Sequence, residues 1–376
     1  MNANSTSGKG AMPSPLRGPA RLSGGDKRGA NRILLGMSGG IDSSAAALML
    51  QDQGYEVVGL TLLTYKSEEA SPWVKDAREL TGKLGIEHHV IDSRKAFKRD
   101  VIDYFVNSYL KGETPNPCIR CNEVIKWKFL LDLSEKFNCN HISTGHYVRL
   151  AEKDGLFYIQ KGVDPAKDQS YYLWNIGQDV LQKAVFPLGS FTKEEIKEYS
   201  EKNGFLRKKK RKESMGVCFL QNRDYRDYLR SVLPAGHPAL KKGDIVDAES
   251  NVIGKHDGFP FYTIGQKRHI ENLPPGHCVT KIIADKNLLV TGKRDKLFSK
   301  DVSLKTFRIT PDASLWKNKK VFIRIRGIDK VPGYFGTIEK HNATLHVSFD
   351  QPVWALTPGQ SLVFYHDDMV IGGGIV

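Results

Sequence analysis

The sequence lacks any apolar run of about eighteen residues, which excludes a helix that spans a membrane. Cysteine is scarce as well, with five residues in a chain of 376. An odd number of cysteines without a signal peptide argues against a disulfide framework. We therefore expect reduced thiols with chemical or metal-binding roles, in the cytoplasm. No internal repeat is evident.

Acidic residues are in the minority, because 56 Lys and Arg stand against 42 Asp and Glu and give a net charge of +14. This excess indicates a polyanionic partner, and tRNA would fit an enzyme of this size. The apolar share of 40% is sufficient for folded cores. The length exceeds one typical domain, so we expect two or three domains.

The first thirty-one residues have few large apolar side chains and many Gly, Ser, Pro, Lys and Arg. We expect a disordered basic tail at 1–31. Strands and helices then alternate up to about residue 150. The predicted strands are 32–37, 56–63, 88–91 and 141–144, and the predicted helices are 43–53, 72–84, 94–110 and 122–137. Such alternation predicts an α/β fold with a doubly wound parallel sheet that binds ligands at the carboxyl ends of its strands.

The middle of the chain, from about 161 to 238, is helical and basic in character. A capping box at Thr192–Glu195 predicts a helix start there. Six consecutive cations at 207–212 are expected to contact phosphate groups. Beyond residue 240, short apolar runs separated by Gly and Pro predict small, barrel-like β domains. These runs are 245–246, 259–264, 279–283, 288–291, 321–326, 344–349 and 361–365.

The segment Ser38-Gly39-Gly40-Ile41-Asp42-Ser43-Ser44 follows the first predicted strand and opens a helix. A turn at a helix N-terminus presents backbone N–H groups and the positive end of the helix dipole, which suits an oxyanion such as pyrophosphate. It is not a Walker loop, because no Gly-Lys-Ser/Thr follows. The pattern resembles the PP-loop of enzymes that split ATP into AMP and pyrophosphate.

Two cysteines, Cys118 and Cys121, stand in a proline-stiffened segment that we place in a loop before a helix. A thiol there, beside Arg120, is expected to ionise more easily than a free one. Cys218 lies two residues after Gly216, in a segment that we expect to be mobile. By contrast, Cys139 and Cys278 lie in apolar segments and are expected to be buried and inert.

Three chemistries remain open for Cys118, Cys121 and Cys218. A structural zinc site is weakly supported, because it needs four protein ligands and no second close pair is present. A three-thiolate iron–sulfur cluster with one open iron site is the second. The third is a persulfide relay, in which one thiol carries sulfur and another resolves it as a disulfide.

Seven motifs in order carry a resemblance that runs from residue 31 to the C-terminus. They are Gly36–Ser44, Thr114–Asn122, Thr144–Tyr147, Lys167–Tyr171, Gly216–Phe219, Gly254–Gly258 with Tyr262–Arg268, and Thr357–Gln360. In these motifs the chain resembles the tRNA-specific 2-thiouridylases of the bacterial MnmA type. The resemblance implies a cytoplasmic tRNA-uridine 2-sulfurtransferase. Such an enzyme adenylates the C2 oxygen of the wobble uridine (U34) with ATP and replaces it with sulfur.

The resemblance also implies the domain plan. A PP-loop domain, similar to the adenine nucleotide alpha hydrolases, is expected at 32–210. A small central domain is expected at 211–285 and a C-terminal β-barrel-like domain at 286–376. The implied partners are the tRNA anticodon arm and either a sulfur-donor protein or sulfide, with no membrane. We expect a monomer or a weak dimer.

The resemblance assigns roles to individual residues. The catalytic thiols are Cys121 and Cys218. The ATP-binding residues are Gly36, Met37, Ser38, Gly39, Gly40, Ile41, Asp42, Ser43, Leu62 and Gly145. The tRNA-binding residues are Asn116, Pro117, Cys118, His146, Lys167, Asp168, Gln169, Arg324, Arg326 and Gln360. Mg²⁺ is expected with ATP, and Asp42 is either its ligand or a cap for the first helical turn.

One departure from the family pattern lies at Cys118, where the best-known members carry Asp. The change leaves two sulfur routes open, a persulfide on Cys218 or a 4Fe–4S cluster held by Cys118, Cys121 and Cys218. Two other functions also stay open. They are a different PP-loop adenylating enzyme that forms amides, and a non-catalytic RNA-binding or iron–sulfur protein.

Overall fold

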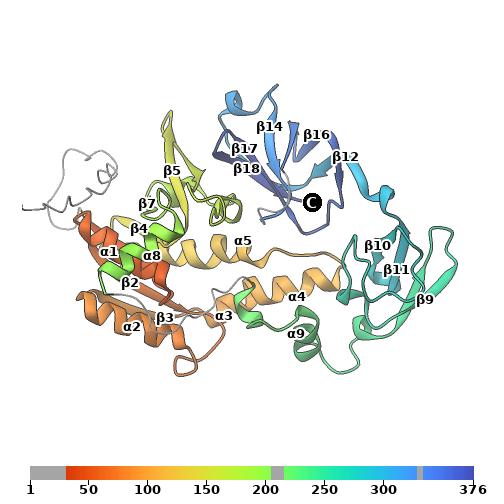
Figure 1. The fold of residues 1–376 in the computed structure, drawn as a ribbon, viewed down its shortest axis with the longest axis horizontal. Helices are drawn as coiled ribbons and strands as arrows, with labels where there is room; N and C mark the ends of the chain where they lie inside the picture. Colours follow the sequence, from red (N-terminus) through yellow and green to blue (C-terminus); the bar gives the residue numbers. More distant parts are fainter. Residues whose placement is uncertain (1–30, 205–215, 328–332) are drawn as a thin grey trace, which may run out of the picture.

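The structure is a computed structural model that describes residues 31–204, 216–327 and 333–376. The predicted tail at 1–31, except its last residue, and the cationic run at 207–212 lie outside the described residues. Figure 1 shows an α/β part, a small sheet and a larger antiparallel sheet. Within the described ranges, no helix is both long and apolar enough to cross a membrane.

The α/β part is built on a five-stranded sheet in the order β3-β2-β1-β4-β7. Its strands are β1 (Arg32–Gly36), β2 (Glu56–Leu63), β3 (Glu87–Asp92), β4 (His141–Thr144) and β7 (Ala184–Val185), and the neighbours pair in parallel. The prediction of a parallel sheet is therefore confirmed. All four predicted strands form within one or two residues of their expected bounds.

Both faces of this sheet are covered by helices, as the alternating side chains of β1 require. Ile33 and Leu35 pack with residues of α1 (Ile41–Asp52), α2 (Pro72–Leu84) and α8 (Lys193–Lys202). Leu34, between them in the sequence, belongs to the cluster of Trp127 and Leu130 on the opposite face. The sheet is thus doubly wound.

Two longer helical stretches each contain a π-helical turn. The first consists of α3 (Arg94–Phe97), η1 (Lys98–Ile102) and α4 (Asp103–Leu110), and it matches the predicted helix 94–110. The second consists of α5 (Pro117–Cys121), η2 (Asn122–Trp127) and α6 (Lys128–Ser134). It begins five residues before the predicted start, so Cys118 and Cys121 lie within a helix and not in a loop. The reason is a cap, because the Asn116 side chain accepts from the Ile119 N–H and Pro117 occupies the first turn.

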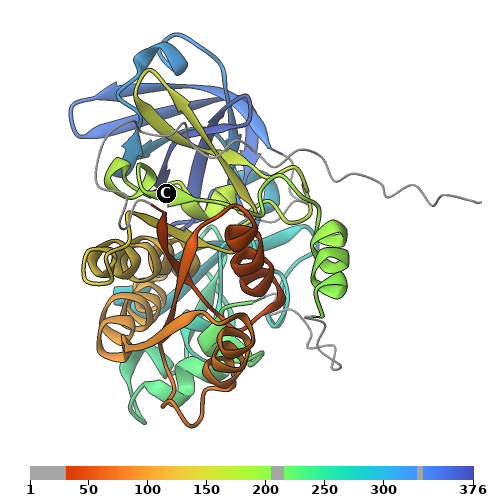
Figure 2. The same ribbon diagram turned by 90° about the vertical axis from the view of Figure 1, so that its left-hand side faces the viewer.

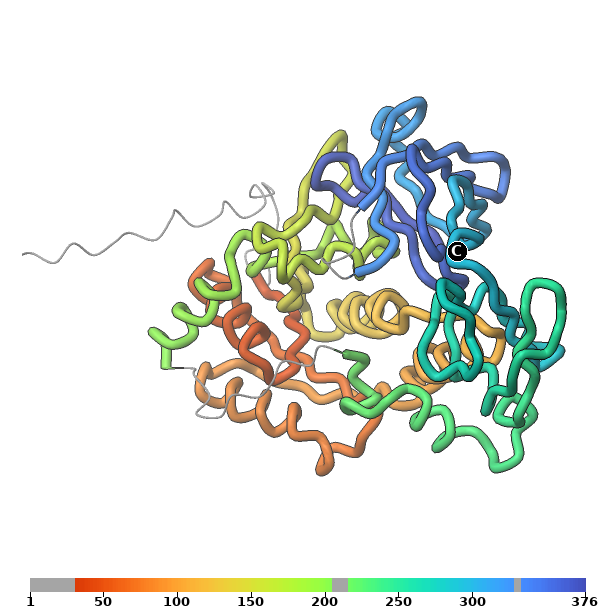
Figure 3. The backbone as a smooth tube through the Cα atoms, turned by 45° about the vertical axis from the view of Figure 1, so that its right-hand side comes forward, coloured from red at the N-terminus to blue at the C-terminus, as the bar shows by residue number. Residues whose placement is uncertain are grey.

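The middle of the chain packs beside α4 and then forms the small sheet (Figure 3). Its helices are η4 (Cys218–Leu220), α9 (Tyr225–Val232), η5 (Pro238–Leu240), η6 (Phe259–Phe261), η7 (Ala284–Lys286) and η8 (Arg294–Leu297). Its sheet has the order β10-β11-β8-β9, from β8 (Gly243–Val246), β9 (Val252–His256), β10 (His277–Ile283) and β11 (Leu288–Lys293). The predicted strand 259–264 is wrong. Pro260 cannot donate to a strand ladder, and a 3₁₀ turn forms instead.

The C-terminal part is a nine-stranded antiparallel sheet in the order β12-β16-β15-β14-β17-β18-β6-β5, with β13 paired to β18. Its C-terminal elements are β12 (Phe298–Leu304), β13 (Thr306–Ile309), η9 (Ala313–Leu315), β14 (Val321–Arg324), β15 (Tyr334–His341), β16 (Thr344–Trp354), β17 (Ser361–His366) and β18 (Met369–Ile375). Two of its strands, β5 (Val148–Lys153) and β6 (Leu156–Lys161), come from the first half of the chain. Figure 2 shows this hairpin against the C-terminal strands. The hairpin is absent from the sequence prediction.

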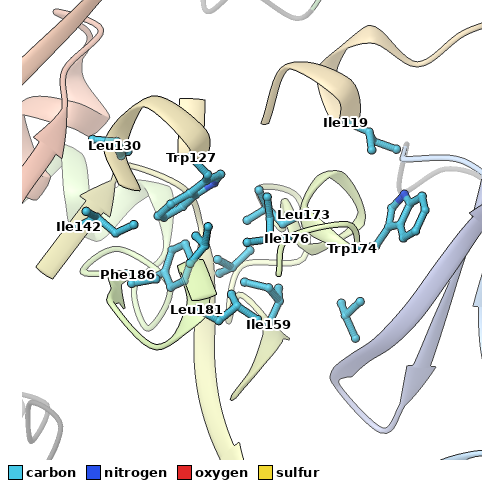
Figure 4. Close-up of a cluster of buried hydrophobic side chains, with 14 of the residues drawn as sticks. Ile119, Trp127, Leu130, Ile142, Ile159, Leu173, Trp174, Ile176, Leu181 and Phe186 are labelled. Carbon is cyan, nitrogen blue, oxygen red and sulfur yellow. The ribbon is translucent and has the colours of Figure 1, made fainter. Parts of the chain in front are cut away.

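A buried cluster joins the α/β part to the C-terminal sheet (Figure 4). Trp127 is fully buried and packs among residues that follow β6, in η3 (Ser170–Leu173) and α7 (Gln178–Leu181). Val363 and Tyr365 of β17 belong to the same cluster. Continuous apolar packing of this kind holds the two parts as one body.

Candidate functional site

The loop between β1 and α1 is shaped by its own serines and glycines. The Ser43 and Ser44 hydroxyls donate to the Gly40 carbonyl, at 3.0 Å and 2.9 Å, and support the first turn of α1. Gly39 has φ +66°, and a Cβ there would lie 2.5 Å from the Trp73 carbonyl oxygen. The loop is therefore closely packed, and the N–H groups of the first helical turn have no acceptors within the helix. This is the geometry of an anion site.

The predicted nucleotide residues meet at the carboxyl ends of three neighbouring strands. Gly36 ends β1, Leu62 lies near the end of β2, and Gly145 follows β4. A Cβ at Gly145 would lie 3.1 Å from the Asp42 backbone and 3.2 Å from the Ser43 nitrogen. A side chain at position 145 would therefore require the loop or the end of β4 to shift by a few tenths of an ångström. The structure thus brings the expected set together: Gly36, Met37, Ser38, Gly39, Gly40, Ile41, Asp42, Ser43, Leu62 and Gly145.

Asp42 has partners that the sequence analysis missed. The Lys193 ammonium donates to Asp42 Oδ1 at 2.6 Å, and the Tyr147 hydroxyl donates to the same oxygen at 2.7 Å. The expected capping role for Asp42 is wrong, because α1 starts without a side-chain cap. Lys193 lies at the start of α8 within the capping box of Thr192 and Glu195, which is confirmed. Tyr147 closes one of the seven motifs, but neither that motif nor the capping box indicates a contact with Asp42.

The three thiols of interest lie in one neighbourhood. Cys118 and Cys121 lie three residues apart in α5. Phe219, next to Cys218, belongs to the same apolar cluster as Cys121, and its ring lies 5.2 Å from that of Phe105. Folding thus unites two segments that are distant in sequence.

The thiol neighbourhood is connected to the phosphate loop through aromatic side chains. Tyr65 follows β2, and its ring lies 6.2 Å from that of Phe97, which in turn lies 6.0 Å from the ring of Phe219 beside Cys218. The Tyr65 ring lies 5.2 Å from that of Trp73, whose carbonyl oxygen faces Gly39. The sulfur groups and the anion site therefore share one region of the molecule.

Burial makes these thiols harder to ionise. It raises the pKa of Cys121 to about 12, and it also raises the pKa of Cys118 and Cys218, although both residues reach solvent. The expected easier ionisation of Cys118 is therefore wrong. The guanidinium of Arg120 lies 3.3 Å from Glu123. The cation that lowers the pKa of all three thiols is Lys126, which the sequence analysis missed.

The other two cysteines behave as expected. Cys139 and Cys278 are buried, and burial raises the pKa of each thiol, to about 11 for Cys139. All five cysteines are free thiols. In the described ranges, no group of three or more His, Cys, Asp or Glu side chains is arranged to hold a metal ion. The three thiols are therefore neighbours without forming a metal-ligand cluster.

The segment before α5 is held by a loop of the C-terminal part. The Thr114 N–H donates to the Pro358 carbonyl at 2.8 Å, and Gln360 Nε2 donates to the Thr114 carbonyl at 2.6 Å. Arg326 and Gln360 line one small cavity. Gln360 is thus placed beside the segment that leads into Asn116, Pro117 and Cys118, and Arg326 lines the same cavity as Gln360.

Asp168 and Arg324 are placed differently from the expected RNA contact. Arg324 Nη1 lies 3.0 Å from Asp168 Oδ2, with side-chain exposures of 10% and 4%. Asp168 also accepts from the Ser170 hydroxyl at 2.9 Å. The pair faces the interior between β14 and the segment after β6, so an RNA contact would require it to open.

The remaining predicted tRNA residues lie near the end of β4. His146 is buried, its Nδ1 lies 2.6 Å from the Thr144 hydroxyl, and burial lowers its pKa well below the usual value. Gln169 accepts from the Tyr147 N–H at 3.0 Å, and Lys167 is half-buried nearby in sequence. These side chains order the strand end beside the phosphate loop.

Comparison with known proteins decides the family. The tRNA methyl transferase HUP domain model matches residues 31–222, the corresponding PRC-barrel domain 230–293, and the aminomethyltransferase beta-barrel domain 299–376. The tRNA-specific 2-thiouridylase MnmA 2 of Phocaeicola vulgatus is 41% identical over 347 residues, covering 92% of this chain and 98% of that protein. The chain belongs to the tRNA-specific 2-thiouridylase family.

Other members of the tRNA-specific 2-thiouridylase family are similarly close. MnmA 3 of Bacteroides fragilis is 41% identical over 352 residues (93% and 95% of the two chains), and MnmA of Amoebophilus asiaticus 38% over 360 residues (91% and 94%). Among solved structures, the U34-tRNA thiolase NcsA from Methanococcus maripaludis with its 4Fe-4S cluster has a TM-score of 0.34 at 18% identity. It covers 55% of this chain and 68% of that one. A similarity at that level carries no argument about chemistry. The resemblance in the seven motifs and the expected fold are confirmed.

Proposed function

We propose that this thiouridylase-family chain is a tRNA-uridine 2-sulfurtransferase that uses ATP to exchange the C2 oxygen of the wobble uridine (U34) for sulfur. Family membership over nine-tenths of the chain supports the reaction. The single observation that supports it is the packing of Phe219, the neighbour of Cys218, in the apolar cluster that contains Cys121. An amide-forming PP-loop enzyme would need no such pair of thiols.

The first step is activation of a poor leaving group. The C2 oxygen attacks the α-phosphorus of ATP, the bond to the β-phosphate breaks, and pyrophosphate departs toward the loop of Ser38 to Ser43. The N–H groups at the start of α1 would stabilise its charge. The uridine then carries AMP on its C2 oxygen, so a later attack at C2 expels AMP.

The second step transfers sulfur. A persulfide on Cys218 attacks C2 through its outer sulfur, the C–O bond breaks, and AMP leaves. The thiolate of Cys121 then attacks Sγ of Cys218. The bond between this Sγ and the transferred sulfur breaks, and its electron pair stays on the transferred sulfur, which remains bonded to C2. A disulfide between Cys121 and Cys218 results, and an external dithiol must reduce it. Lys126 favours the thiolates that this step needs.

In the part of the chain that the structure describes, no group of side chains is gathered to hold a metal ion. The Asp42 carboxylate, the expected Mg²⁺ ligand, is already bonded by Lys193 and Tyr147. The thiols of Cys118, Cys121 and Cys218 are not gathered as cluster ligands in the described structure. We therefore route no step through either metal, and the persulfide route is the one we propose.

The proposed partners follow from the chemistry. The tRNA would bind by its anticodon arm, near Asn116 to Cys118, and a sulfur-donor protein would load Cys218. The reaction would take place in the cytoplasm. The catalytic and binding roles of individual residues, the domain bounds and a monomeric or weakly dimeric state remain predictions.

The test uses the full chain with an unmodified tRNA transcript, Mg-ATP and a persulfide or sulfide source. AMP and pyrophosphate are quantified, and the digested RNA is analysed by mass spectrometry. We expect 2-thiouridine together with AMP. AMP formed with a small amine acceptor and no thionucleoside would establish an amide ligase instead. RNA binding without pyrophosphate release would establish a non-catalytic protein.

A further inference from the structure

A buried lysine reaches the phosphate loop from a distant element. Lys193 is 3% exposed, and its backbone N–H donates to Asp164 at 3.0 Å while its ammonium donates to Asp42. Burying an ammonium is costly unless it is paired and hydrogen-bonded. The position of this charge is therefore closely determined by the fold.

The charge lies where a nucleotide would place its phosphates. Asp42 stands in the first turn of α1, at the positive end of the helix dipole. Its carboxylate alone would repel a triphosphate. Lys193 and Tyr147 both donate to Asp42 Oδ1, and the ammonium lies 5.7 Å from the centre of the Tyr147 ring. The Lys193 ammonium thus offsets the negative charge of Asp42, and a single hydrogen bond joins this ammonium to the phosphate loop.

We propose that Lys193 is a binding residue for the pyrophosphate part of ATP, positioned by Asp42 and Tyr147. An ammonium has three N–H donors, so it can bond Asp42 and a phosphate oxygen at the same time. The proposal rests on the proposed function only in taking the loop to bind ATP. The competing role is a structural one, in which Lys193 does no more than neutralise Asp42.

The experiment measures binding of inorganic pyrophosphate and of ATP to the full chain by calorimetry, with EDTA present. EDTA removes free divalent metal, so Asp42 cannot contribute to phosphate binding through a cation that bridges its carboxylate and the ligand. We expect Lys193→Met to weaken both ligands by about 10- to 100-fold, the range of a hydrogen bond to a charged group. Lys193→Arg should retain most of the affinity. Lys197→Met, on the exposed side of α8 beside Glu194, should change nothing.

A second pair of variants separates the two roles. Asp42→Asn removes the carboxylate, and Asp42→Asn combined with Lys193→Met removes both charges. If Lys193 binds phosphate, the double variant stays at least about tenfold weaker than Asp42→Asn alone. Equal affinity of these two variants would overturn the inference. The double variant removes both members of the buried pair, Asp42 and Lys193, and leaves neither charge unpaired. It therefore still tests the inference when the single variant Lys193→Met does not fold.

The result is independent of the thiolation assay. A wild-type chain that binds pyrophosphate through Lys193 but forms no 2-thiouridine would refute the proposed function and leave this inference standing. A wild-type chain that thiolates tRNA while Lys193→Met binds pyrophosphate normally would refute only this inference.

Discussion

At the scale of single residues, thiols with the same chemistry differ because of what surrounds them. Cys121 lies in an apolar cluster, and its pKa is raised to about 12. Cys118 and Cys218 reach solvent; burial raises the pKa of both thiols, and Lys126 opposes that effect. A single cation therefore influences how much thiolate is present at each sulfur position.

Replacing Lys126 should slow thiol chemistry without moving the cysteines. Burial raises the pKa of Cys118 and Cys218 and Lys126 lowers it, so Lys126→Met should raise it further. Less thiolate then exists at any pH below the new value, and alkylation becomes slower. The measurement is the rate of iodoacetamide labelling at Cys118 and Cys218 between pH 7 and about pH 9.5, by peptide mass spectrometry.

The control for this series is Lys128→Met. Lys128 lies two residues further on, and its ammonium pairs with Asp132 at 2.7 Å on the exposed side of α6. Its removal should leave the labelling profile unchanged. Equal profiles for Lys126→Met and the wild type would show that Lys126 does not face the thiols.

The two glycines of the phosphate loop should differ in their tolerance of alanine. Gly39→Ala introduces a Cβ 2.5 Å from the Trp73 carbonyl oxygen at φ +66°, so we expect a loss of about 1–3 kcal/mol in unfolding free energy and weak ATP binding. Gly40 has φ −88°, and its nearest atom to a new Cβ is Ser38 Oγ at 3.4 Å. Gly40→Ala should therefore unfold near the wild-type value in urea. Similar losses for both variants would contradict this account.

Site residues were predictable where a short segment carries the whole pattern. The loop at Ser38 to Ser43 and the pair Cys118 and Cys121 each stand within one motif. Lys126 and Lys193 were missed because their roles depend on partners from other elements, and nothing local marks a lysine as facing a thiol or a carboxylate. The same limit explains Asp168 and Arg324, whose mutual pairing joins sequence positions that no local pattern connects.

At the scale of elements, local sequence signals predicted well where helices and strands begin and end. They predicted poorly which strands pair with one another. Gly85, in the left-handed conformation, ends α2 as expected. Asn116 and Pro117 start α5 five residues before the predicted start at residue 122. The hairpin β5–β6 was missed because the strand it pairs with, β18, lies far along the chain. The pairing joins Gln160 of β6 to Met369 of β18. Local alternation of side chains does not reveal which sheet a hairpin will join.

The capping box at the start of α8 gives a test at this scale. The Glu195 N–H donates to the Thr192 hydroxyl at 3.3 Å, and the Thr192 N–H donates to Glu195 Oε2 at 2.7 Å. Thr192→Ala should cost about 1 kcal/mol of unfolding free energy in urea. Thr192→Ser keeps the hydroxyl and should cost much less. A loss of the same size for both would mean that the methyl group, and not the cap, provides the stability.

At the scale of the whole molecule, charged pairs join residues from the first half of the chain to the C-terminal strands. The pair of Asp168 and Arg324 is buried, whereas Arg149 and Asp368 form a 2.6 Å pair with side-chain exposures of 32% and 38%. Both pairs connect the same two parts of the chain. They differ mainly in how much water surrounds them.

This difference predicts unequal losses of stability. Arg324→Met leaves Asp168 buried without its cation and should cost about 3–5 kcal/mol. Arg149→Met breaks a pair that water already screens and should cost about 0–1 kcal/mol. Urea unfolding followed by tryptophan fluorescence measures both. Equal losses would contradict the view that the buried pair of Asp168 and Arg324 holds the segment after β6 to β14.

The most direct measurement is sulfur transfer to U34 by two matched cysteine variants, read by mass analysis of digested tRNA after one turnover. Cys218→Ala removes the thiol that would carry the sulfur, and Cys278→Ala removes a buried thiol far along the chain. The account predicts 2-thiouridine from the wild type and from Cys278→Ala, and none from Cys218→Ala. Normal 2-thiouridine formation by Cys218→Ala would contradict it.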